Sequence, residues 1–300
     1  MSNNSNLHRA KKAKNDEFYT QLSDIENELR HYKDHFKGKV VYCNCDDARK
    51  SNFVKYFKIN FDALGLKKLI ATGYRKNSRG IKLVYDSSNK EANIELLEGD
   101  GDFRSEECMK LLDEADIVVT NPPFSLASLY MQQLVEHGKK FLIIGPLNLI
   151  KYKDTFPYFM KGQAWPGVNW VKSFTEPDGK IMKMGNVVWY TNLDHKKRYE
   201  KIVCIEKYDP AKYPKFDNYD AVEVGKYTDI PKDYAGVMGV PISYLMHHNP
   251  EQFEIVGELN NGSDNEFDYA KPMIDGKVKY MRILIKRKLV GENGEKENVQ

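Results

Sequence analysis

The first half of the chain alternates between strand-like and helix-like segments, and this alternation constrains the fold more than any other feature. Four short apolar runs have the length and composition of buried strands: 40–43, 68–72, 117–120 and 141–144. Amphipathic segments with helical spacing lie between them, for example at 53–61 and 126–137. Strands that alternate with helices form a parallel, doubly wound sheet. We therefore predict an α/β fold with a mostly parallel sheet.

Strand signals outside this parallel core predict antiparallel additions to the sheet. Two short apolar runs, 81–85 and 94–97, indicate short strands or a hairpin. The aromatic and β-branched runs around Trp170 and Val187 indicate an antiparallel pair at the edge of the sheet. Before the first strand, apolar residues at helical spacing predict a helix that continues to Phe36 and ends at Gly38.

The composition of the chain changes after about residue 200, where prolines and tyrosines become frequent. An apolar and basic run at 280–288 predicts a final strand. The 300 residues suffice for one α/β domain of about 200 residues with a smaller appendage. We therefore expect a larger domain over 1–200 and a smaller region over 201–300, with a soft boundary between them.

Composition and cysteine spacing exclude several classes of protein. The longest apolar run, 141–150, is interrupted by Gly145 and Pro146 and is too short to cross a bilayer. The cysteines at 43, 45, 108 and 204 form neither a disulfide framework nor a metal-ligand spacing. We expect a cytoplasmic protein with no membrane partner and no bound metal, and a monomer by default. The net charge of +3 does not by itself indicate a nucleic-acid partner.

The tetrapeptide Asn121-Pro122-Pro123-Phe124 follows the predicted strand at 117–120. Two prolines stop the strand and fix the backbone just beyond its carboxyl end, the edge where open α/β sheets bind ligands. An amide side chain, a carbonyl with no neighbouring amide donor and an aromatic ring are presented together. This combination suits the exocyclic amine of a planar base. A strand-ending turn without a chemical role is an equally good interpretation of the tetrapeptide alone.

Two more segments combine polar and aromatic residues beside predicted elements. The run 98–104, Glu-Gly-Asp-Gly-Asp-Phe-Arg, lies between a strand and a helix, so that Asp102 can accept the amine of an adenine ring and Phe103 can stack on it. The alternative is a turn in which Asp102 caps the following helix. The run 15–21, Asn-Asp-Glu-Phe-Tyr-Thr-Gln, also fits the acidic start of a helix.

The order of these segments resembles a known family. Glu-Phe-Tyr-Thr, a first strand with its loop, Gly-Asp-Phe and then Asn-Pro-Pro-Phe follow one another as in N6-adenine DNA methyltransferases in which target recognition follows the catalytic motif. Longer phrases resemble the EcoRI-type adenine-specific methyltransferase family and cover most of the chain: 10–21, 42–47, 99–108, 116–125, 188–195 and 249–257.

The resemblance implies a Rossmann-like sheet that binds S-adenosylmethionine and methylates N6 of an adenine flipped out of double-stranded DNA. A companion restriction endonuclease fits this function but is not required for activity. The implied catalytic loop is Asn121, Pro122, Pro123 and Phe124. Cofactor contacts are expected at Phe18, Tyr19, Thr20, Cys43, Asp46, Asp102, Phe103 and Asn121.

One loop departs from the family pattern. The loop after the first strand is usually rich in glycine, which lets the backbone approach the ligand. Here Cys43-Asn44-Cys45-Asp46-Asp47-Ala48 contains no glycine, and no acidic residue follows the second strand at 71–74 to hold ribose hydroxyls. We expect Asp46 or Asp47 to take part of that role.

Target recognition is expected from residues after about 150, where basic and aromatic residues are interleaved. Candidate phosphate contacts, each of which can equally be a solvated surface charge, are Lys196, Lys197, Arg198, Arg282, Lys286, Arg287 and Lys288. Phe124 is the expected platform for the flipped base, with Trp189 or Tyr190 against its opposite face. Two other functions stay open: an amino-methyltransferase that acts on RNA or on protein glutamine, and a DNA-binding protein that has lost catalysis.

Overall fold

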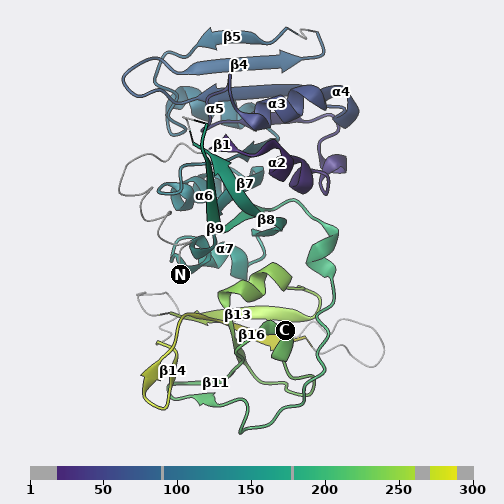
Figure 1. Ribbon diagram of the computed structural model, residues 1–300, viewed down its shortest axis with the longest axis vertical. Coiled ribbons are helices and arrows are strands. Elements are labelled where there is room, and N and C mark those ends of the chain that lie inside the picture. The colour runs from purple at the N-terminus through teal and green to yellow at the C-terminus, as the bar shows by residue number, and fades with distance from the viewer. Residues whose placement is uncertain (1–18, 89–90, 177–178, 261–270, 289–300) are drawn as a thin grey trace. The chain divides into compact units, whose positions relative to one another are not determined.

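The computed structural model describes residues 19–88, 91–176, 179–260 and 271–288 (Figure 1). The chain divides into two compact units. The larger unit comprises Met1–Thr155 and Gln163–His195, and the smaller unit comprises Phe156–Gly162 and Lys196–Gln300. Within the described ranges, no helix has the length and apolar character needed to cross a membrane.

Four parallel strands form the centre of the larger unit and confirm the four predicted strand positions. In spatial order they are β7 (Lys140–Pro146), β6 (Ile117–Thr120), β2 (Val40–Cys43) and β3 (Lys68–Gly73). Most of their residues are buried, as expected for parallel strands with both faces covered. Because the strands are parallel, their carboxyl ends meet at one edge of the sheet.

Antiparallel strands extend the sheet on both sides of this centre and complete a nine-stranded sheet within the described residues. β4 (Ile81–Asp86) and β5 (Asn93–Leu96) form the predicted hairpin beside β3. On the other side, β9 (Ile181–Thr191) pairs with β7, β8 (Trp165–Thr175) pairs with β9, and β1 (Tyr19–Thr20) pairs with β8. The β8–β9 pair is the antiparallel edge pair that the sequence predicts, and the sheet as a whole is mixed.

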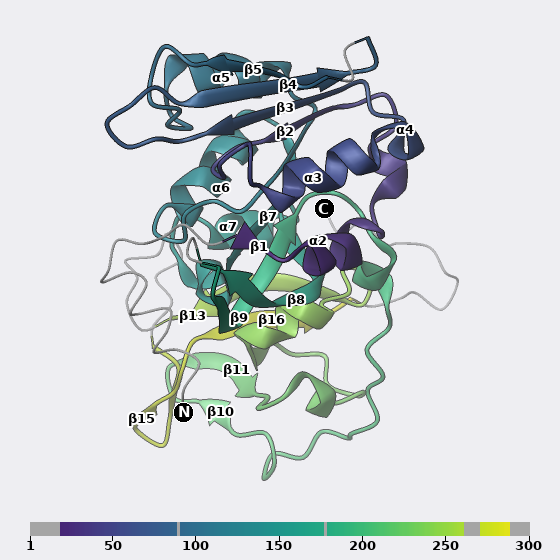
Figure 2. The same ribbon diagram turned by 45° about the horizontal axis from the view of Figure 1, so that its top comes forward.

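Helices cover both faces of this sheet (Figure 2). One face carries a single apolar cluster to which three helices contribute: α2 (Leu22–Leu29), α3 (Asn52–Ile59) and α4 (Phe61–Leu64). The other face is covered by α5 (Glu106–Glu114) and α6 (Ala127–Glu136), which contact β2 and β7. A short 3-10 helix, η2 (Leu147–Lys151), follows β7. Each crossover returns the chain to the same end of the sheet, which places the loops after β2, β3 and β6 together.

The first helix is shorter than predicted. It ends at Leu29 instead of continuing to Phe36, and a 3-10 helix, η1 (Lys33–His35), follows. The backbone N–H groups of His31 and Tyr32 each bond to the carbonyl three residues back, so the chain tightens out of the α-helix. The apolar residues that suggested a longer helix are nevertheless all buried.

Among the described residues, the smaller unit is built on a five-stranded sheet in which β16 lies between β12 and β13 and confirms the predicted final strand. In spatial order its strands are β10 (Lys215–Phe216), β11 (Tyr219–Glu223), β12 (Met238–Pro241), β16 (Arg282–Arg287) and β13 (Phe253–Leu259). The short elements of this unit are α7 (Phe156–Met160), η3 (Lys196–Tyr199), η4 (Tyr227–Asp229), η5 (Ile242–His247), β14 (Met273–Ile274) and β15 (Lys277–Val278).

Candidate active site

The loop after β6 holds Asn121-Pro122-Pro123-Phe124 at the carboxyl edge of the parallel strands. Asn121 is 6% exposed and Phe124 is 7% exposed, so the polar and the aromatic side chain both lie inside the protein. The Phe124 ring packs edge-to-face against Phe174 of β8, with ring centroids 5.9 Å apart. The loop is therefore fixed at one end by its prolines and at the other by a buried aromatic ring.

The loop after β2 is bonded directly to β6 and α6. Thr120, the last residue of β6, donates its hydroxyl to the backbone carbonyl of Asn44, and Tyr130 of α6 donates its hydroxyl to the Asn44 side-chain oxygen. Ser51 donates its hydroxyl to the Asp46 carboxylate at 2.9 Å, which orients that side chain. Cys43 is buried at the end of β2, and burial raises the pKa of its thiol, so it contributes a neutral wall.

Cys45 takes the conformation that a glycine would have in this loop. Its φ is +72°, in the left-handed region that costs a residue with a Cβ about 1–2 kcal/mol. The glycines stand on facing segments instead: a Cβ on Gly73 would lie 3.0 Å from the Asp46 carbonyl oxygen, and one on Gly101 would lie 2.7 Å from the Gly73 carbonyl oxygen. The end of β3 therefore packs closely against the backbone of the β2 loop, although that loop itself contains no glycine.

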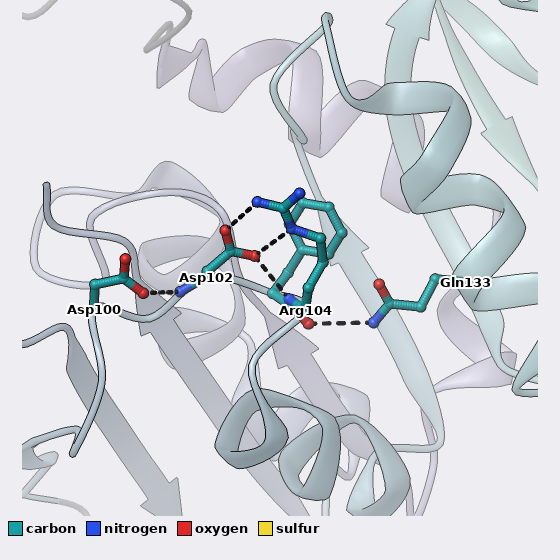
Figure 3. Close-up of polar contacts among 5 residues, drawn as sticks. Asp100, Asp102, Arg104 and Gln133 are labelled. Carbon is teal, nitrogen blue, oxygen red and sulfur yellow. Dashed lines mark hydrogen bonds and ion pairs between the residues drawn. The ribbon is translucent and has the colours of Figure 1, made fainter.

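Asp102 is held by three hydrogen bonds from Arg104 (Figure 3). Its Oδ1 accepts the Arg104 backbone N–H and Nε–H, each at 2.9 Å, and its Oδ2 accepts Nη2 at 2.5 Å. These bonds lower the pKa of Asp102, so its carboxylate is charged and fixed at neutral pH. Each carboxylate oxygen has two lone pairs, so Oδ2 keeps capacity for a further donor such as an exocyclic amine.

Ser105, and not Asp102, caps the helix that follows. The Ser105 hydroxyl accepts a hydrogen bond from the Cys108 N–H at 3.3 Å at the start of α5. The interpretation of Asp102 as a helix cap is therefore wrong. The Asp102 backbone N–H is instead bonded to the Asp100 carboxylate at 3.0 Å (Figure 3), so the run 100–104 is ordered by its own side chains.

Tyr130 connects the Asp102 loop to the loop after β2. Phe103 is 6% exposed, and its ring lies edge-to-face against Tyr130, with centroids 4.9 Å apart. The Gln133 side chain donates to the Phe103 carbonyl at 3.3 Å (Figure 3). The hydroxyl of the same tyrosine bonds Asn44, so one buried side chain contacts both loops.

β1 lies beside the start of α3, the helix that follows the loop after β2. Asn52, the first residue of α3, donates its side-chain amide to the Thr20 carbonyl at 2.8 Å. Thr20 is 1% exposed, and its hydroxyl has no hydrogen-bond partner among the described residues. Tyr19 pairs with Thr175 of β8. The expected cofactor contact Phe18 lies outside the described residues.

Trp189 and Tyr190 are core residues, which corrects their expected role as a second platform for a flipped base. Both side chains are 0% exposed. Trp189 packs edge-to-face on Phe53, and the Tyr190 hydroxyl donates to the Pro146 carbonyl at 2.9 Å. A strand in the middle of a sheet buries its aromatic side chains on both faces, so neither ring is available to a ligand.

Two of the basic residues expected to contact phosphates instead make contacts within the smaller unit. Arg282 pairs with Glu223 at 2.6 Å, with both side chains only 13% exposed. Arg287 donates to the Pro231 carbonyl at 2.9 Å and lies over the Phe253 ring. The exposed members of the predicted set are Lys196, Lys286 and Lys288.

The sequence predicted the loops that meet at this edge but missed the residues that hold them. Arg104, Tyr130 and Gly73 were not expected to take part. The Asp-x-Arg spacing was the one local signal that could have identified Arg104. No local signal marks the other two, because their contacts depend on segments that are distant in the chain.

A mixed α/β sheet with an Asn-Pro-Pro-Phe turn and an Asp-Phe loop at the ends of its parallel strands fits the methyltransferase class of fold. The chain belongs to the family of the adenine-specific methyltransferase EcoRI, whose family model matches residues 6–288. The resemblance and the enzyme class expected from the sequence, an adenine-specific DNA methyltransferase, are thereby confirmed.

Comparison with individual proteins gives the same result, since three type II methyltransferases are similar to the chain over nearly its whole length. The chain is 46% identical to the type II methyltransferase M.EcoRI of Escherichia coli, over 94% of this chain and 96% of that protein. It is 38% identical to M.MpnI of Mycoplasma pneumoniae, over 94% and 98% of the two chains, and 37% identical to M.MgeORF184P of Mycoplasma genitalium, over 95% and 99%. No solved structure matches the chain.

Proposed function

We propose that the protein transfers a methyl group from S-adenosylmethionine to N6 of an adenine flipped out of duplex DNA, at the carboxyl edge of β2, β3 and β6. The observation that carries this proposal is the direct linkage of the loops there. Thr120, which precedes the catalytic loop, bonds the Asn44 loop. Gly73 lies against the backbone of the same Asn44 loop, and Gly101 of the Asp102 loop lies against Gly73.

The residues at this edge fit the proposed cofactor. The left-handed Cys45 and the two facing glycines allow the close backbone packing that nucleotide-binding loops require. Asp102, charged and fixed by Arg104, can accept the exocyclic amine of the cofactor's adenine. The oriented Asp46 carboxylate and the buried Thr20 hydroxyl supply further polar contacts. When bound, S-adenosylmethionine supplies an electrophilic sulfonium methyl group.

Asn121 and Pro122 would activate the target nitrogen. Adenine N6 is a poor nucleophile, because its lone pair is delocalised into the ring. Hydrogen bonds from the N6 amine to the Asn121 side-chain oxygen and the Pro122 carbonyl favour a pyramidal nitrogen with a localised lone pair. Burial of Asn121 strengthens such bonds, and correct orientation can supply roughly 7–11 kcal/mol. An amide cannot act as a base, so the proton leaves to water after transfer.

Phe124 is the proposed platform for the flipped adenine. The amine is out of reach inside a duplex, so the base must leave the stack. Because the Phe124 ring is only 7% exposed and packs on Phe174, stacking requires a local movement that uncovers one ring face. We further propose that the smaller unit contacts the DNA backbone through its exposed Lys196, Lys286 and Lys288, and that the enzyme works without a companion endonuclease.

The test is methyl transfer followed by mapping of the product. Purified protein is incubated with labelled S-adenosylmethionine and unmodified duplex DNA, and modified adenines are located by modification-sensitive sequencing. We expect N6-methyladenine at one short sequence. Cofactor binding with transfer only to RNA or protein would overturn the substrate, and absence of cofactor binding would favour an inactive DNA-binding protein.

A further inference from the structure

The smaller unit contains a cavity of about 280 Å³ that has no role in the proposed methyl transfer. It lies between η3, the extended chain after it, η4 and η5, and its lining includes Lys197, Lys201, Glu200, Tyr227 and His247. Ligand pockets for small organic molecules begin at about 300 Å³, so this volume suits one small ligand and not a helix or a strand.

An aromatic pair forms one wall of this cavity. The rings of Tyr227 and His247 are stacked, with centroids 3.9 Å apart and planes within 12° of each other. Tyr227 is half-buried while His247 is exposed, so the pair is anchored on one side and open on the other. Partial burial and the neighbouring Lys197 lower the pKa of His247, which keeps its ring neutral at pH 7. A neutral, anchored stack of this kind suits a flat aromatic ligand.

Charged side chains complete the lining around this pair. Lys197 and Lys201 outnumber the single carboxylate in the lining, that of Glu200, so the cavity attracts an anion. Val203, which is 75% exposed, also lines it and adds apolar surface next to Lys201. A ligand that matches both features has an aromatic ring and a negative group close to it. Within DNA, these features occur together in a single nucleotide.

We propose that this cavity binds one unstacked nucleotide of the DNA, with its base against the Tyr227–His247 pair and its phosphate at Lys197 and Lys201. This inference rests on the proposed function, because it takes DNA as the substrate. The site is separate from the pocket proposed for the methylated adenine, since all the residues that line it belong to the smaller unit. It would help to hold the DNA strand while the target base is out of the stack.

The first test uses thymidine 5′-monophosphate, which lacks the exocyclic amine that Asn121 and Asp102 are proposed to bind. Full-length protein is saturated with S-adenosylhomocysteine, and contact to the thymine protons is measured by saturation-transfer NMR. We expect transfer to the base in the wild type and in Tyr227→Phe, which keeps the ring stack. Tyr227→Ala and Lys201→Ala should each weaken it several-fold. Lys207→Ala is the matched control, since it removes an exposed lysine from the same segment outside the cavity.

The second test measures the KM for duplex DNA in the same variants. Loss of one base-stacking contact should raise the KM about tenfold in Tyr227→Ala, with kcat and the affinity for S-adenosylhomocysteine unchanged. An unaltered NMR signal and KM in Tyr227→Ala would overturn the proposal. So would a KM effect confined to Lys201→Ala, which would indicate phosphate contact without base stacking. If thymidine monophosphate binds as expected but neither the wild type nor any variant methylates DNA, the nucleotide site is supported and the proposed function is overturned.

Discussion

The loops after β2 and β6 leave adjacent strands at the same edge of the sheet, yet they are held in different ways. The β6 loop is fixed by its own sequence, because two prolines set its backbone and Phe124 anchors it in the core. The β2 loop is fixed by others: Tyr130 and Ser51 bond its side chains, and Gly73 makes room for its backbone. The first kind of loop can be recognised from local sequence and the second cannot. The two loops should therefore respond differently to substitution.

The largest effect, a loss of kcat, is expected from Asn121→Ala in the β6 loop. Loss of a single buried hydrogen-bonding group that acts on the reacting centre lowers kcat by about 10²–10³-fold. Affinity for DNA and for S-adenosylhomocysteine should stay within a few-fold of the wild type, since the prolines still hold the backbone. The measurement is single-turnover methyl transfer alongside equilibrium binding. Asn93→Ala, which truncates an exposed asparagine of β5, is the control and should keep full activity. Equal losses of binding and turnover would show that Asn121 holds the loop and does not act on the substrate.

The next largest loss of stability and cofactor affinity is expected from Gly101→Ala, which tests whether the site depends on the close packing of the Asp102 loop against Gly73, the residue that packs against the β2 loop. Gly101 has φ +84°, and a Cβ there would lie 2.7 Å from the backbone oxygen of Gly73. The Gly73 backbone cannot shift without disturbing the segments packed around it, so we expect a loss of about 1–3 kcal/mol in the free energy of unfolding. Affinity for S-adenosylhomocysteine should fall about tenfold, because Asp102 is displaced with the loop.

Gly99→Ala is the matched control for this prediction. It lies two residues away in the same run, and a Cβ there would meet no atom of the described part of the chain within 4 Å. Denaturant unfolding and calorimetric titration of S-adenosylhomocysteine should both match the wild type. If the two alanine variants behave alike, the close approach of the segments has no energetic role.

The difference between the loops also explains how far the sequence could predict the structure. Strands such as β6, at Ile117–Thr120, were located correctly because a run of buried apolar residues is a local signal. The Asn-Pro-Pro-Phe turn was placed correctly for the same reason, since each proline acts on its own residue and its neighbour. The hairpin of β4 and β5 and the β8–β9 pair likewise follow from short periodic runs.

Features that depend on distant segments were not predicted. The β2 loop lacks the expected glycine, but Gly73 of β3 supplies the space for its backbone, and Gly101 in turn makes room for Gly73. Both glycines lie far along the chain from Cys45. Similarly, Arg282 and Arg287 resemble surface charges in the sequence, and only the sheet order of the smaller unit reveals their partners. Helix α2 ends early for a related reason, because a 3-10 turn keeps the same apolar side chains buried. Periodicity reports which residues are buried and not how the backbone buries them.

A smaller change in the free energy of unfolding is expected when Cys45 is replaced, and its sign depends on the residue that takes its place. Cys45→Gly and Cys45→Ala both remove the thiol, but only glycine adopts φ +72° without cost. We expect the glycine variant to be about 1 kcal/mol more stable than the alanine variant in denaturant unfolding. The same pair of substitutions at Cys43, a β2 residue outside the left-handed region, should favour alanine. A preference for alanine at both positions would mean that the left-handed turn is not kept in solution.

The smallest effect is expected from Arg104→Gln, and its pH dependence identifies how Arg104 acts. Arg104 lowers the pKa of Asp102, so the pair stabilises the folded protein above the usual Asp pKa of about 3.9 and loses this contribution as the pH falls through the lower folded value. Because the Arg104 side chain is 53% exposed, we expect less than about 1 kcal/mol at pH 7. Denaturant unfolding should show a difference from the wild type that is constant from pH 7 to 5 and shrinks below pH 4. Lys110→Gln, which breaks the exposed Glu106–Lys110 pair on α5, should show no measurable difference from the wild type at any of these pH values. A difference for Arg104→Gln that persists unchanged at pH 3 would mean that the guanidinium acts through its contact with the Phe103 ring, 5.5 Å from the ring centroid, and not through its ion pair with Asp102.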